Sequence, residues 1–184
     1  METMRRMRSS WILLMLAASA VFSCAWAGLN GPQMPRIEGA TLAGRSVMLP
    51  DAAAGKTAIL VFGFTKASRG PTTAWGKRID EKFGSAPEVV WYELPVLESV
   101  PRLIRGMVIS SIKNDTPENL RDHFVPVLHR EAELKKFVNY DAHDDAYIVV
   151  LDSHGNLRYQ IHGAWSEAAY AQLQKALDEL LQQK

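Results

Sequence analysis

The chain has 184 residues, of which 47% are hydrophobic and 22% are charged. This length and apolar fraction exclude an intrinsically disordered protein and suffice for one domain with a substantial core. A formal net charge of +1 argues against phosphate-driven nucleic-acid binding, so no nucleic-acid partner is expected. Cys24 is the single cysteine, which rules out an internal disulfide, a zinc–thiolate site and a dithiol pair.

The first 27 residues have the layout of a secretory signal peptide. Met1–Arg8 is basic, Trp11–Phe22 is almost wholly apolar, and Ala25-Trp26-Ala27 supplies an A-x-A cleavage motif. The apolar run is shorter than the roughly 20 residues that a membrane-spanning helix needs. We therefore expect export to a periplasmic or secreted location, with removal of residues 1–27 and hence of the only cysteine. An uncleaved N-terminal anchor, a lipidated Cys24 and a mitochondrial presequence remain alternatives.

The next segments predict a linker, a hairpin and a buried strand. Residues 28–38 are read as a Gly/Pro-rich linker and residues 39–184 as the domain. Thr41–Leu49 predicts a short strand or hairpin. Thr57–Phe64 is a continuous apolar run, which is typical of a central strand buried on both faces.

Two helices and a second strand are expected after that. The spacing of Trp75, Ile79 and Phe83 predicts a helix over the second half of Lys66–Phe83, and Glu88–Leu94 predicts the second strand. Ser99 is expected to be the N-cap of a further helix, with Pro101 near its first position.

The apolar stripe of the helix that follows Ser99 runs to about Ile112. We expect this stripe to pack on the sheet. A membrane-surface or partner-helix role is the alternative, because Arg102, Arg105 and Lys113 make the segment basic as well as apolar.

The second half of the chain predicts a strand–turn–strand unit between helices. Together with the preceding elements this order predicts an α/β fold, a thioredoxin-like mixed β-sheet with helices on both faces. The expected elements are helices at Thr116–Phe124, Glu131–Val138 and Ser166–Leu181, and strands at Ala146–Leu151 and Leu157–Ile161.

Several short motifs resemble those of redox proteins. Gly39–Gly44 and Leu49-Pro50-Asp51 are similar to the opening of redoxins, and Phe62–Thr65 resembles the strand end of SCO-type copper-delivery proteins. In those families a reactive cysteine follows almost immediately. Here Thr65-x-x-Ser68 resembles the peroxiredoxin Thr-x-x-Cys pattern with serine in place of cysteine. Ala146 stands where thioredoxins carry a proline.

The second half resembles the mitochondrial ATP synthase assembly-factor family, a cysteine-poor thioredoxin-like group. The similarity covers roughly 57–180, and Tyr159 stands where the family prefers tryptophan. This resemblance implies a protein that assists assembly of a membrane complex. The family-motif positions are Asp152, Gly155, Arg158 and Gly163.

The missing thiol limits the chemistry that the first helix start can perform. Disulfide exchange and peroxide reduction need a thiolate, and a serine does not ionise near neutral pH without a positioned base. We therefore expect Ser68 to cap the helix. The sequence favours a non-redox binding protein of the cell envelope, without a cofactor and with a protein partner such as a membrane-complex subunit.

The candidate binding residues belong to the degenerate redox loop and the neighbouring helix: Thr65, Lys66, Ser68, Arg69, Arg102 and Arg105. Lys66 and Arg69 are expected to be a solvated basic pair, with anion binding as the alternative. Other functions remain open. One is a thiol-disulfide oxidoreductase or peroxiredoxin-like enzyme that uses Cys24. Another is a metal carrier related to SCO-type proteins, which would use the segment that contains Asp141, His143, Asp144 and Asp145.

Overall fold

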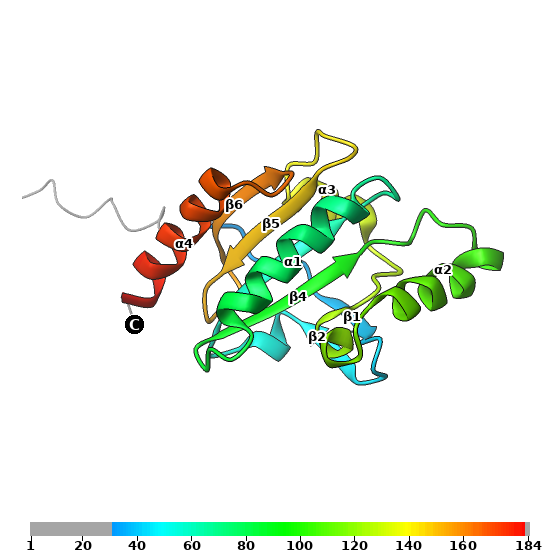
Figure 1. The fold of residues 1–184 in the computed structure, drawn as a ribbon, viewed down its shortest axis with the longest axis horizontal. Coiled ribbons are helices and arrows are strands. Elements are labelled where there is room, and N and C mark those ends of the chain that lie inside the picture. Colours follow the sequence, from blue (N-terminus) through cyan, green and yellow to red (C-terminus); the bar gives the residue numbers. More distant parts are fainter. Residues whose placement is uncertain (1–30, 183–184) are drawn as a thin grey trace, which may run out of the picture. The chain divides into compact units, whose positions relative to one another are not determined.

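The computed structural model describes residues 31–182 and shows one four-stranded mixed sheet in the order β4-β3-β5-β6 (Figure 1). β3 (Thr57–Gly63) pairs in parallel with β4 (Val89–Pro95) and antiparallel with β5 (Ala146–Leu151). β6 (Leu157–Gly163) completes the sheet as the antiparallel partner of β5. The predicted mixed sheet is confirmed. The predicted signal peptide, with Cys24, lies outside the described residues.

β3 is the central strand because its side chains are apolar on both faces. Ala58, Leu60 and Phe62 belong to one core, and Ile59 and Val61 belong to the other. All five side chains are fully buried. A strand with this composition has no polar face to turn toward water, so it must be covered from both sides.

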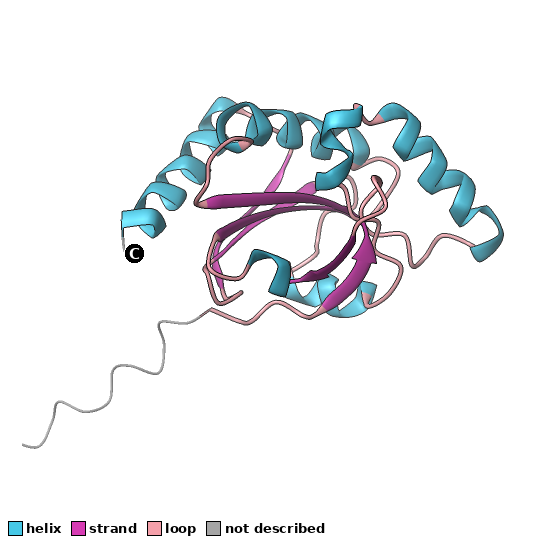
Figure 2. Cartoon of the chain, turned by 90° about the horizontal axis from the view of Figure 1, so that it is seen from below, coloured by secondary structure: helices cyan, strands magenta, loops and turns pink. Residues whose placement is uncertain are grey.

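Helices cover both faces of the sheet, as predicted (Figure 2). α3 (Glu131–Phe137) and the hairpin of β1 (Ile37–Ala40) and β2 (Ser46–Leu49) contribute to one core. The other core contains apolar residues of α1 (Arg69–Phe83) and α4 (Glu167–Gln182). Trp75 and Trp91 are buried in this second core.

The prediction that residues 28–38 form a linker is wrong for most of this segment. Met34 and Ile37 are buried, Gln33 forms a bridge with Asn156, and β1 already begins at Ile37. β2 is the only strand within the predicted 41–49 segment, and its hairpin partner precedes that segment. The apolar residues at 34 and 37 outweigh the Gly/Pro content, because they cover the hydrophobic face of the sheet.

The start of α2 (Arg102–Asp115) also differs from the expectation. Pro101, not Ser99, is the N-cap residue, and no side chain caps this helix. Ser99 instead donates from its N–H and from its hydroxyl to Glu131 Oε2, at 3.0 and 2.6 Å. A charge-assisted contact with α3 therefore replaces the local cap. The predicted helix at 116–124 is a 3₁₀ segment, η2 (Glu118–His123), and a second one, η1 (Asp51–Ala53), follows β2.

Candidate binding site

Thr65 and Ser68 close a hydrogen-bonded turn immediately before α1. Thr65 Oγ1 accepts from the Ser68 N–H at 3.1 Å, and Ser68 Oγ accepts from the Thr65 N–H at 3.3 Å. This reciprocal pairing at i and i+3 has the form of a capping box placed one turn ahead of the helix. Ser68 Oγ also donates to the Thr65 carbonyl at 2.9 Å. The turn is therefore fixed by its own side chains.

The prediction that Ser68 caps α1 is wrong in its chemistry. Ser68 occupies the N-cap position, but its side chain makes no cap hydrogen bond to the helix. The hydroxyl is already used by Thr65, and the Ser68 carbonyl accepts the Thr72 N–H at 2.9 Å. The helix thus begins through a backbone bond, while the side chain stabilises the preceding turn.

Ser68 is fully buried beneath the end of β3. A Cβ built on Gly63 would lie 3.0 Å from Ser68 Oγ and 3.0 Å from Thr72 Cγ2, so a larger residue would have to displace these side chains slightly. Among the described residues, no histidine side chain is hydrogen-bonded to Ser68. A buried hydroxyl without a base has no means of activation, so the geometry does not support serine catalysis.

Lys66 and Arg69 are both exposed, as predicted for a solvated basic pair. The Arg69 guanidinium also pairs with the Asp115 carboxylate. The Arg69–Asp115 ion pair links the first residue of α1 to the last residue of α2. The degenerate loop, residues 65–69, and α2 are therefore neighbouring parts of one surface, as expected from the sequence.

Glu93 is a buried carboxylate beneath α1 that sequence reasoning missed. Its side chain projects from β4, and a Cβ on Gly76 would stand 2.8 Å from Glu93 Oε2. Within residues 31–182, Oε2 has no hydrogen-bond partner. Burial raises the pKa of Glu93 from 4.5 to about 7, against the opposing effects of the Thr72 hydroxyl and the Arg69 charge. The available signal in the sequence is Glu93, the one acidic residue in the stretch VVWYEL at 89–94.

α2 does not pack its apolar stripe on the sheet, which contradicts the sequence expectation. None of its residues is buried, and only Ile109 and Ile112 pack partly against the core beneath α1. Leu103, Met107 and Ile104 are 99%, 73% and 45% exposed. We call these three side chains the α2 apolar face. The amphipathic pattern is real, but the structure leaves much of the stripe in solvent.

Arg102 and Arg105, the two basic binding candidates on α2, play different parts. Arg105 donates to the carbonyls of Glu98 and Val100, at 2.8 and 2.9 Å for Nη2, and so holds the loop before the helix. Arg102 is exposed. Arg105 therefore positions α2, and Arg102 is available to a ligand.

The acidic segment 141–145 does not converge on a metal position. His143 contacts Asp144 at 2.8 Å, while Asp145 contacts His162 at 2.7 Å. The Asp141 carboxylate accepts from the Tyr147 hydroxyl at 3.1 Å. Across residues 31–182, no group of three or more potential ligands is arranged to hold a metal ion.

Three of the four family-motif residues, Asp152, Gly155 and Arg158, lie at the turn between β5 and β6. The Asp152 carboxylate accepts the N–H groups of His154 and Asn156 at 2.9 and 3.0 Å, and Arg158 lies 3.8 Å away. Burial alone would raise the pKa of Asp152, but these hydrogen bonds and the Arg158 charge lower it. Gly155 and Gly163 both adopt positive φ, at 81° and 121°. Gly163 differs from the other three, because it ends β6 and its carbonyl accepts from the Trp75 indole N–H of α1 at 3.1 Å.

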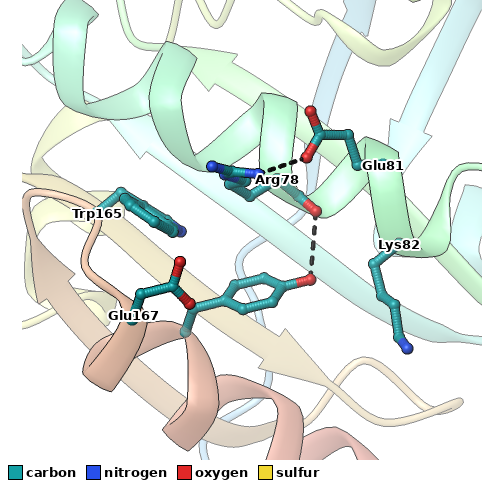
Figure 3. Close-up of a pocket in the computed structure, with 6 residues that line it drawn as sticks. Arg78, Glu81, Lys82, Trp165 and Glu167 are labelled. Atoms are coloured by element: carbon teal, nitrogen blue, oxygen red, sulfur yellow. Dashed lines mark hydrogen bonds and ion pairs between the residues drawn. The ribbon is translucent and has the colours of Figure 1, made fainter.

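A separate pocket of about 240 Å³ lies between α1 and the start of α4 (Figure 3). The Arg78 guanidinium lies 4.8 Å from the centre of the Trp165 ring and donates to Glu81 at 2.9 Å. Trp165 is half-buried and packs against the second core. Two of the charged lining residues are cations and two are carboxylates, so no single charge dominates the pocket. Its lining residues are Arg78, Glu81, Lys82, Trp165, Glu167 and Tyr170.

Solved structures of other proteins share this arrangement of helices and strands. No family model and no curated protein matches the chain. The pneumococcal exposed lipoprotein thioredoxin Etrx1 of Streptococcus pneumoniae superposes with a TM-score of 0.57 at 16% identity, over 78% of this chain and 99% of that one. The fold is thioredoxin-like.

Two further solved structures support the same assignment. A thiol-disulfide oxidoreductase from Bacteroides fragilis gives a TM-score of 0.55 at 14% identity, over 78% of this chain and 98% of that one. BsSco, a member of the Sco family of cytochrome c oxidase assembly proteins, gives a TM-score of 0.54 at 13% identity, over 80% of this chain and 94% of that one. At these identities the likeness concerns the thioredoxin-like fold alone.

Proposed function

We propose that this chain is a non-redox thioredoxin-like binding protein of the cell envelope that assists the assembly of a membrane protein complex. The observation that carries the proposal is the buried Ser68 in its closed turn. A thioredoxin-like domain performs thiol chemistry through an accessible thiolate, and the side chain at this helix start is a buried hydroxyl. The single cysteine, Cys24, belongs to the segment expected to be removed on export.

The surface around the degenerate loop supports a binding role. Arg69 and Asp115 join the loop to α2, and Lys66 and Arg102 extend this surface as exposed cations. The α2 apolar face adds side chains that monomeric proteins normally cover. The resemblance to the ATP synthase assembly-factor family favours a membrane-complex subunit as the partner.

Site-specific photo-crosslinking in exporting cells tests this function. A photoreactive amino acid replaces Lys66 in the loop, and a control variant carries it at Lys175, which is exposed on α4. We expect a reproducible adduct with a membrane-complex subunit at position 66 and none at position 175. Recovery of uncrosslinked chain alone at position 66 would overturn the proposed function.

A further inference from the structure

The α2 apolar face is an uncharged strip along one side of the helix. At 3.6 residues per turn, Leu103, Met107 and Ile104 fall within an arc of about 100°. A Cβ built on Gly106 meets no atom within 4 Å, so open space also surrounds this part of the backbone. The same side carries only small polar residues besides these: Ser110, Ser111 and Asn114.

Basic side chains accompany this strip. Arg102 and Lys113 are exposed and lie on the same flank of the arc, roughly a quarter turn from Leu103 at 3.6 residues per turn. The one acidic residue of α2, Asp115, is paired with Arg69. A surface that is apolar in its middle and cationic along its edge is complementary to a ligand that is apolar inside and anionic at its surface.

We propose that the α2 apolar face docks onto the surface of an anionic phospholipid bilayer. Leu103 and Met107 enter the boundary of the acyl chains, and Arg102 and Lys113 lie among the phosphate headgroups. A helix lying in the interface gains both apolar burial and attraction to anionic lipid. Within residues 31–182, no helix is long and apolar enough to span a bilayer, so this contact is peripheral.

The position of α2 suits such a contact. α2 extends away from the sheet at one end of the domain (Figure 1), and a single convex helix needs no groove in its ligand. The Arg69–Asp115 pair connects it to the degenerate loop. Docking would therefore hold the loop next to the membrane. The inference rests on the proposed role at a membrane complex and adds the lipid contact that brings the loop to it.

Vesicle flotation of the protein recovered from exporting cells tests the proposal. The probes are phosphatidylcholine vesicles with and without 30% phosphatidylglycerol. We expect flotation with the anionic vesicles alone, weakened by salt, and a decrease of about tenfold or more in vesicle affinity for Leu103→Ser combined with Met107→Ser. The matched control is Met48→Ser, which removes an exposed apolar side chain of β2 and should keep parental affinity.

The variants remain informative because their side chains are exposed. The double serine variant should unfold at the same temperature as the parent, so lost flotation would not reflect unfolding. Any contribution of the N-terminal segment is common to all variants and cancels in the comparison. A second measurement places an environment-sensitive fluorophore at Met107→Cys in a Cys24→Ser background. Its emission should shift to the blue with anionic vesicles, and a label at Met48→Cys should not respond.

Equal flotation of the parent and the double serine variant would overturn the inference. An unshifted fluorophore at position 107 would also overturn it. If position 66 crosslinks to a membrane-complex subunit while the parent fails to float, the proposed function stands and the lipid inference falls. A protein adduct at Leu103 that forms without lipid would likewise assign the α2 apolar face to a protein partner.

Discussion

Ser68 has a buried side chain whose hydrogen bonds all return to Thr65. Burial determines what a thiol could do at this position, because modification would require local opening of the turn. In a Cys24→Ser background, we expect Ser68→Cys to react with an aromatic disulfide reagent at least about 100-fold more slowly than Lys66→Cys, which is exposed. Comparable rates would show that the turn opens readily and that the described burial does not hold in solution.

Glu93 should make stability depend on pH. The folded-state pKa is raised to about 7 from 4.5, so the folded chain retains a proton that the unfolded chain releases. The free energy of unfolding therefore falls as pH rises from about 4.5 to about 7, by up to about 3 kcal/mol, and then levels off.

Glu93→Gln should remove this dependence, because the amide keeps the shape of the side chain without the titration. Denaturant unfolding at pH 5 and pH 8 measures it. From pH 5 to pH 8, the free energy of unfolding of the variant should rise by about 2 kcal/mol relative to that of the parent. An equal difference between variant and parent at both pH values would contradict the assignment of a buried, protonated Glu93.

At the scale of elements, the turn between β5 and β6 depends on close contact with the segment after β2. Gly155 and Gly55 share a φ of 81°, but a Cβ on Gly155 would lie 2.7 Å from Pro50 Cγ, whereas one on Gly55 meets nothing within 4 Å. Both alanine substitutions incur the cost of positive φ. Gly155→Ala should therefore be less stable than Gly55→Ala by about 1–3 kcal/mol in chemical denaturation. Equal losses would show that the Pro50 contact contributes nothing.

Apolar periodicity predicted the elements whose burial is continuous. The ends of β5 and the start of β3 match the sequence expectation, because every residue of these segments except the last of β3 is buried. The start of α2 could not be predicted, since Ser99 is used by Glu131, a residue 32 positions away. The same limit applies to the site. Local sequence identified Thr65 and Ser68, whereas the burial of Glu93 under Gly76 depends on how α1 packs across β4.

The exposure of α2 shows why an amphipathic pattern alone did not decide its role. Leu103 and Met107 have the spacing of core-facing residues, and such spacing usually indicates burial against a sheet. Here the sheet is already covered on that face by α1 and α4. No area of core remains for the outer side of α2, so its apolar residues stay available for a ligand.

At the scale of the whole molecule, a complete thioredoxin-like domain carries a closed, hydroxyl-bearing turn and an exposed apolar helix side by side. The Arg69–Asp115 pair joins the start of α1 to the end of α2, and the α2 apolar face lies on the first half of the same helix. The scaffold is therefore a thioredoxin-like fold, and the proposed binding role is assigned to the surface that the loop and α2 form.

Reduction of insulin disulfides in the presence of dithiothreitol tests the central claim most directly. The full chain and its Cys24→Ser variant should both give the rate of dithiothreitol alone, because the accessible thiolate that turnover needs is absent beside α1. Turnover above that rate by the full chain, lost in Cys24→Ser, would identify Cys24 as a working thiol and contradict a function based on binding alone.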